Sequence, residues 1–168
     1  MDRPSNIPNE TIWIGRSPTA DTRTCDYANV SKGTLLESSR QHVGDIAKGF
    51  EFFKAMIDRQ VEIHDHDKFS DIDGFHRDFV TGFEQHSWWD NHRAVNRHHL
   101  NDEDGVPEDV NLIDVLDLIV DCVMAGKARS GSVWDITISD DVLRRAFANT
   151  VEIFKERVQL AEEVENEQ

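Results

Sequence analysis

Apolar residues recur at steps of three and four positions along most of the chain, which is the spacing of one face of an α-helix. The clearest stripes are Leu36, Val43, Ile46, Phe50, Phe53 and Ile57, then Ile72, Phe75, Phe79 and Phe83, and finally Leu143, Phe147, Val151, Phe154 and Val158. Residues 111–125 are apolar almost throughout, which predicts the central helix of a bundle. A further helix is expected over residues 88–100. The pattern therefore predicts an all-α fold of about five to six helices.

Local signals indicate where two of these helices begin. Thr34 and Glu37 match a capping box, so we expect the first helix to start at Thr34. Ser70, with Asp73 three residues later, is expected to cap the next helix.

The N-terminal part of the chain has a different composition. Residues 1–33 hold three of the four prolines and many small polar residues, so we expect an irregular arm, anchored by Trp13. The last residues are strongly acidic and should fray. We predict a single domain, with an arm at 1–33, a helical domain at 34–160 and an acidic tail at 161–168.

Composition narrows the class of protein. The 168 residues carry a net charge of −15, which argues against a broad nucleic-acid-binding surface, because phosphate contacts need Lys and Arg. A small anionic substrate remains compatible, since a bound metal reverses the local sign. Only two cysteines occur, and no apolar run approaches the roughly 20 residues of a membrane span. We expect a cytoplasmic protein without a membrane partner.

Residues 64–69, His-Asp-His-Asp-Lys-Phe, contain two consecutive His-Asp pairs. Imidazole nitrogens and carboxylate oxygens are the usual ligands of a hydrolytic divalent metal. Either pair could be the operative one. Further candidate ligands lie on both sides, at His42, His92, His98, His99 and Asp121. A His-Asp pair alone arises often by chance, so the hypothesis of a metal site depends on these additional residues.

Residues 88–100 place polar side chains on one expected helical face. His92, Asn96 and His99 follow at i, i+4 and i+7. A solvated face explains this stripe as well as ligand or substrate contact does. His98 points about a quarter-turn from His99 and competes with it for a ligand role.

The apolar helix at 111–125 is interrupted by three carboxylates, Asp114, Asp117 and Asp121, on one stripe. Buried carboxylates are costly unless a cation or donors neutralise them. Asp121 lies deepest in the apolar run and is expected to be a ligand or to support one, with Asp117 as the alternative.

Four basic residues stand out in this acidic chain. Arg16 and Arg23 lie among hydroxyl residues and could contact phosphate, although exposed arginines on a solvated arm are more ordinary. Lys127 and Arg129 form a local basic pair after the apolar helix.

The order His42, His64-Asp65 and Asp121 resembles the metal-binding pattern of the HD-domain phosphohydrolases. The resemblance is closer to a little-characterised HD-like family of tailed phages and bacteria, and it covers about residues 40–125. The matching positions are His64-Asp65 with Lys68 and Phe69; Trp89, His92, Asn96, His98 and His99; and Asp117 with Asp121. Asp67 stands where that family has Ser.

This resemblance implies an HD-like helical bundle and phosphohydrolase chemistry with a divalent ion, one of Mn, Co, Mg, Fe and Zn. The implied ligands of a first ion are His42, His64, Asp65 and Asp121, and His92 and His99 would hold a second ion or contact phosphate. Asp65, Lys68 and His98 are the catalytic candidates, and the substrate contacts are Lys68, Asn96, Arg16 and Arg23. The expected substrate is a small phosphorylated molecule, with a nucleotide favoured.

Two other functions fit the same sequence. An acidic phage protein could mimic DNA and occupy a basic groove of a host protein, in the host cytoplasm. A nucleotide-binding sensor could keep the fold and the metal without turnover. The oligomeric state stays open, a homo-oligomer included.

Overall fold

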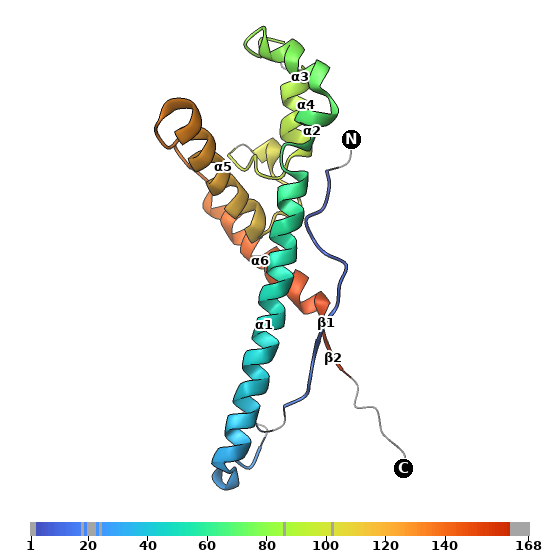
Figure 1. Ribbon diagram of the computed structural model, residues 1–168, viewed down its shortest axis with the longest axis vertical. Helices are drawn as coiled ribbons and strands as arrows, with labels where there is room; N and C mark the ends of the chain where they lie inside the picture. Colours follow the sequence, from blue (N-terminus) through green and yellow to red (C-terminus); the bar gives the residue numbers. More distant parts are fainter. Residues whose placement is uncertain are drawn as a thin grey trace. The chain divides into compact units, whose positions relative to one another are not determined.

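The computed structural model describes residues 3–17, 19, 23, 25–85, 87–101 and 103–161. Within them the regular secondary structure is helical apart from one two-stranded sheet (Figure 1), which confirms the predicted all-α class. The elements are β1 (Ile12–Ile14), η1 (Tyr27–Asn29), α1 (Lys32–Ile63), α2 (His66–Ser70), α3 (Ile72–Phe79), α4 (Ser87–Val95), η2 (Glu103–Gly105), α5 (Leu112–Ser130), α6 (Asp140–Arg157) and β2 (Val158–Leu160). None of the helices in these ranges has the length and apolar content to cross a membrane.

The chain forms two compact units. The first comprises Met1–Ile7 and Met56–Ile153, and the second comprises Pro8–Ala55 and Phe154–Gln168. Helices α1 and α6 each contribute to both units. The predicted acidic tail lies outside the described residues from position 162 onward.

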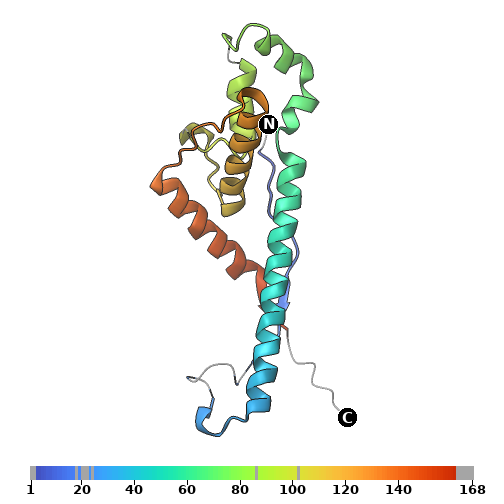
Figure 2. The same cartoon turned by 60° about the vertical axis from the view of Figure 1, so that its left-hand side comes forward.

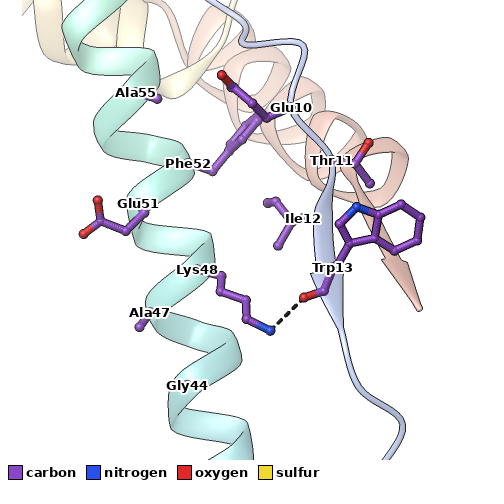
Figure 3. A pocket seen from close by; sticks show the side chains of 10 residues that line it. All are labelled: Glu10, Thr11, Ile12, Trp13, Gly44, Ala47, Lys48, Glu51, Phe52 and Ala55. Atoms are coloured by element: carbon purple, nitrogen blue, oxygen red, sulfur yellow. Dashed lines mark hydrogen bonds between the residues drawn. The ribbon is translucent and has the colours of Figure 1, made fainter. Parts of the chain in front are cut away.

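The second unit is built on a parallel pair of strands, in which Ile12 of β1 lies opposite Val158 of β2. Ile12 is buried, whereas Trp13 is 56% exposed. The prediction that Trp13 anchors the arm is therefore wrong, because neighbouring strand residues point to opposite faces and Ile12 takes the inner one. Lys48 of α1 donates from Nζ to the carbonyl oxygen of Trp13 at 2.7 Å (Figure 3).

The first unit has its apolar core around α5 and α6. The buried residues of this core are Leu100, Val110, Leu118, Cys122, Val142 and Ala146. Asn111 caps α5 in a capping box with Asp114, and the helix ends at Gly131, which adopts the left-handed conformation. Helices α3 and α4 lie side by side at the other end of this unit (Figure 2).

The buried faces of three helices differ from the predicted stripes. In α1 the buried side chains are Phe52, Met56 and Gln60, while Val43, Ile46, Phe50 and Ile57 are exposed. In α6 they are Val142, Ala146, Thr150 and Ile153, while Leu143 and Phe147 are exposed. In α5, Leu116, Ile119, Val120 and Met124 are exposed, although we expected this helix to be the central one of the bundle.

The polar members of these faces explain the difference. Thr150 donates to the carbonyl oxygen of Ala146 at 2.7 Å and accepts from the backbone N–H of Leu112 at 3.0 Å. Buried polar side chains that find such partners carry little penalty, so the inner face need not be the most apolar one.

Two helix starts and one helix end also differ. The hydroxyl of Ser31 accepts from the backbone N–H of Thr34, so α1 begins two residues before the predicted start. Asp71, not Ser70, caps α3 by accepting from the N–H of Gly74. Helix α4 ends at Val95, five residues before the predicted end.

Candidate metal centre

The first His-Asp pair lies in a sharp break between two helices. Helix α1 ends at Ile63, and Asp65 adopts the left-handed conformation with φ of 52° before α2 begins. Aspartate tolerates this conformation better than most residues with a side chain. The side-chain oxygen of Asn96 accepts from the backbone N–H of Asp65 at 2.9 Å. This bond holds the turn against the segment that follows α4.

Two imidazoles of the site are each held by a carboxylate at Nδ1. His64 Nδ1 lies 2.9 Å from Asp117 Oδ1, and His92 Nδ1 lies 2.9 Å from Asp67 Oδ2. The Nε2 atoms lie 3.6 Å and 3.4 Å from the carboxylate of Asp65. A carboxylate that binds one imidazole nitrogen fixes the tautomer and leaves the other nitrogen free to bind a metal. The two pairs therefore present two ligand nitrogens to Asp65.

Two more histidines complete the cluster. His98 Nε2 lies 3.7 Å from Asp65 Oδ1, and its ring stacks on that of His64 with centroids 4.4 Å apart. Nitrogen and oxygen atoms of His92, His98 and His99, and of His64, His98 and Asp117, lie within 4.8 Å of one another in each group. The geometry thus brings together residues that could hold a metal ion.

Unpartnered buried atoms test whether a cation fits. Among the described residues, Asp65 Oδ1, His98 Nδ1 and His99 Nε2 are buried and lack a hydrogen-bond partner. A buried polar atom without a partner is costly, and three that converge on one cluster are explained if a cation binds them. The donor set of imidazole nitrogens and carboxylate oxygens fits a divalent transition metal.

The electrostatics hold two groups of the site, His99 and Asp65, in the protonation states that metal binding needs, whereas those at His64 favour the protonated imidazole. Burial lowers the pKa of His99 to about 3, assisted by the neighbouring His98, so this imidazole is neutral at pH 7. Burial opposes ionisation of Asp65, but the hydrogen bond and charge of Lys68, together with the nearby His64 and His98, outweigh it and lower the carboxyl pKa. The hydrogen bond to Asp117 raises the pKa of His64.

The supporting carboxylates are ionised as well. Burial opposes ionisation of Asp67, but hydrogen bonds from His92 and Asn96 bring its pKa down to about 2. Burial opposes ionisation of Asp117, but the hydrogen bond from His64 and the imidazole of His98, whose Nδ1 lies 3.5 Å from Asp117 Oδ2, together hold its pKa well below the usual range.

The structure places the predicted site residues in two groups. His64, Asp65, Lys68, Asn96, His98 and the histidines at 92 and 99 come together in the first unit, with Asp121 Oδ1 at 4.0 Å from His64 Nε2. His42, Arg16 and Arg23 are exposed residues of the second unit, and neither metal-competent group includes His42. The carboxylates that the sequence left as alternatives take different positions. Asp67 and Asp117 contact the Nδ1 atoms of His92 and His64, whereas Asp65 lies at the Nε2 atoms of the same two rings.

Two residues that support the site, Gln60 and Asn6, were not predicted from the sequence. Gln60 Nε2 donates to Asp117 Oδ2 at 2.6 Å, and Asn6 Nδ2 donates to Gln60 Oε1 at 2.8 Å. Both side chains are buried in the first unit. Residue 6 lies in the predicted irregular arm, so no local pattern marks it. The spacing Phe52, Met56, Gln60 was the only available signal for Gln60.

A cavity of about 330 Å³ opens beside the cluster, with His92, His98, His99 and Asp121 on one wall. A larger cavity of about 580 Å³ lies in the second unit, between β1 and α1 (Figure 3). Its lining, within the described residues, contains the carboxylates of Glu10 and Glu51 but no histidine or cysteine, so it lacks the imidazole ligands of the cluster. We therefore assign the chemistry to the smaller cavity.

No family model matches this chain, and neither a curated protein nor a solved structure matches it significantly.

The variant Asp67→Asn tests the role of the supporting carboxylates. The amide cannot supply the charge that holds His92 Nδ1, so divalent-metal affinity should fall by about 10- to 100-fold, the usual cost of losing such a partner. Competition titration with a chromophoric chelator and Mn²⁺ or Zn²⁺ measures it. Asp73→Asn, on the exposed side of α3, is the matched control. An affinity for Asp67→Asn equal to that of the control would contradict this role.

The low pKa of His99 predicts how the stability of the metal-free protein depends on pH. Its pKa is about 3 in the folded protein and about 6.5 when unfolded, so the unfolded chain binds the extra proton between these values. The contribution of His99 to the free energy of unfolding should therefore fall as pH drops below 6.5, by at most about 1.4 kcal/mol per pH unit. Urea unfolding with EDTA at pH 6.5 to 4.5 measures this slope.

The variant His99→Asn should flatten that slope, whatever it does to stability at neutral pH. His42→Asn removes an exposed histidine of the second unit and should leave the slope unchanged. Equal slopes for the wild type and His99→Asn would show that the unfolding transition does not sense this imidazole.

Proposed function

We propose that this protein is a metal-dependent phosphohydrolase of the HD type that acts on a small phosphorylated molecule, with a nucleotide as the favoured substrate. One observation carries the proposal. Asp65 Oδ1 is buried and unpartnered, and the Nε2 atoms of His92 and His98 lie 3.4 Å and 3.7 Å from it. The resemblance of the His-Asp motif to HD phosphohydrolases supports the reaction class.

His64, Asp65 and His92 are the proposed central ligands of the metal. His99 and Asp121 lie on the wall of the adjoining cavity and are candidates for a second ion or for contact with the substrate. The nitrogen-rich donor set favours Mn, Co, Fe or Zn over Mg. A divalent ion held there would polarise a phosphoryl oxygen and lower the pKa of a water molecule.

The chain's own residues supply the remaining functions. Lys68 lines the cavity and donates to Asp65 Oδ2, so its ammonium group lies beside the proposed metal and can stabilise charge on the phosphoryl oxygens. His98 lines the same cavity and is our candidate for proton transfer to the leaving oxygen. His99 is neutral at pH 7, so one of its ring nitrogens can bind a metal ion or accept a hydrogen bond while the other donates.

A substrate screen tests the proposal. Metal-free protein is reloaded with Mn²⁺, Co²⁺ or Mg²⁺ and incubated with nucleoside mono-, di- and triphosphates and with cyclic and dinucleotides. Release of phosphate or of a larger phosphate fragment should occur only with metal. Metal-dependent binding of a nucleotide without turnover would instead favour the sensor. If no substrate turns over and removal of the metal changes no binding, the phosphohydrolase proposal fails.

A further inference from the structure

Three cationic side chains line the cavity beside the metal centre, although the protein is strongly acidic. They are Lys68, which pairs with Asp65, Arg93, which pairs with Asp104, and Arg129, and the only carboxylate among the described residues of the lining is that of Asp121. The chain as a whole carries a net charge of −15. Positive charge that lines a cleft attracts anions and concentrates them there, even on a protein of negative net charge. The ligand of this cavity should therefore carry negative charge.

Arg129 and Trp134 belong to the part of the lining that the proposed reaction does not use. The guanidinium carbon of Arg129 lies 5.3 Å from the centroid of the Trp134 ring, within the range of a cation–π contact. Gly126 allows this arrangement, because a Cβ there would lie 2.8 Å from the backbone nitrogen of Trp134. The loop after α5 can thus approach the helix closely and set the indole at the cavity.

The two tryptophans of the lining differ in what they offer a ligand. Trp89 is packed among other rings, with centroids 5.3 Å from His92, 5.5 Å from His99 and 5.5 Å from Phe83. Trp134 is 38% exposed and lines the cavity. Trp134 is therefore the aromatic surface on which a planar group of a ligand can lie.

We propose that this cavity binds a single mononucleotide, with its phosphate at the histidine wall and its base against Trp134. The assignment rests on the proposed function and names its substrate class. A volume of about 330 Å³ lies at the lower end of the range of ligand pockets, roughly 300–1,000 Å³, and suits one base, one sugar and one phosphate rather than a dinucleotide. Lys68, beside the histidine wall, supplies positive charge for the phosphate oxygens, and Arg129 adds positive charge at the Trp134 end of the cavity.

The variant Trp134→Leu separates base recognition from phosphate chemistry. The probes are the 5′-monophosphates of adenosine, guanosine, cytidine and uridine, and ribose 5-phosphate, which lacks a base. Loss of a stacking surface should lower kcat/KM for the preferred nucleotide by about 5- to 150-fold. The value for ribose 5-phosphate should stay within twofold. Trp13→Leu removes an exposed tryptophan of the second unit and is the matched control.

Binding gives a readout that does not depend on turnover. Titration of the Mn²⁺-loaded protein with each nucleotide should quench tryptophan fluorescence, and Trp134→Leu should lose that quenching while Trp13→Leu retains it. Arg129→Gln, an exposed substitution at the end of α5, is the second variant. Arg129→Gln should weaken nucleotide binding, and it tests the same end of the cavity if circular dichroism shows that Trp134→Leu does not fold.

The outcomes distinguish this proposal from the proposed function. Equal kcat/KM for ribose 5-phosphate and every nucleotide, unaffected by Trp134→Leu, overturns the mononucleotide site and leaves the phosphohydrolase intact. Quenching through Trp134 without any turnover supports the mononucleotide site and overturns the phosphohydrolase. Absence of both turnover and nucleotide binding overturns both.

Discussion

Asp65→Ala is expected to abolish divalent-metal binding, and with it phosphate release, while the helices stay folded. Asp65 is the carboxylate that His64, His92 and His98 face, at 3.4 Å to 3.7 Å. Its loss removes both charge and geometry from the site. A metal contributes several kcal/mol to stabilisation of a phosphoryl transition state, so turnover should fall by about 10³-fold or more. Elemental analysis after dialysis, phosphate release and circular dichroism measure the three parts of this result.

Two comparisons sharpen that experiment. Asp73→Ala removes an exposed carboxylate of α3 and should keep full metal content. Asp67→Ala should weaken metal binding without abolishing it, because Asp67 contacts Nδ1 of His92 and not the nitrogen that faces the proposed metal. If Asp65→Ala retained full metal content, the operative pair would be His66-Asp67.

Arg97→Met should cost about 3 to 5 kcal/mol of unfolding free energy, the usual loss when one partner of a buried ion pair is removed. Arg97 and Asp114 are 2% and 0% exposed, and two bonds of 2.7 Å and 3.0 Å join them. Burial raises the pKa of Asp114 even with Arg97 beside it. Without the guanidinium the carboxylate keeps only bonds from Asn6 and Asn111. Urea unfolding at pH 7 measures the loss.

An exposed ion pair offers the control for this prediction. Arg40 and Glu37 are 67% and 76% exposed, so Arg40→Met should change the unfolding free energy by less than about 1 kcal/mol. The double variant Arg97→Met with Asp114→Leu should recover part of the loss, since it removes the stranded charge. A loss below 1 kcal/mol for Arg97→Met would mean that the pair contributes no more than a surface pair does.

The helices could be predicted from the sequence because their signal is local. Steps of three and four residues indicate a helix whatever it packs against, and the stripes fall within observed helices except at their last residues, since Phe83 follows α3 and Val158 begins β2. Which face turns inward is a tertiary property. The inner face of α1 includes Gln60, whose amide binds Asp117 and Asn6, and no pattern within α1 reveals those partners.

The sequence predicted which residues form the site better than it predicted which side chains bind one another. The motif at 64–69 and the histidines at 92–99 do come together, although α4 ends before His98 and His99 and so the same-face argument does not explain their position. The roles of Asp67 and Asp117 could not be predicted. They depend on which imidazole nitrogen each carboxylate meets, which is set by the packing of α2 against α4 and by the place of α5.

The most direct test of the proposed metal centre is anomalous diffraction from crystals soaked in Mn²⁺, recorded on both sides of the manganese edge. We predict an anomalous peak in contact with the carboxylate of Asp65 and with Nε2 of His64 and His92, with the Nδ1 atoms still bound to Asp117 and Asp67. A peak elsewhere in the protein, or none at saturating Mn²⁺, would contradict the assignment of this cluster as a metal centre.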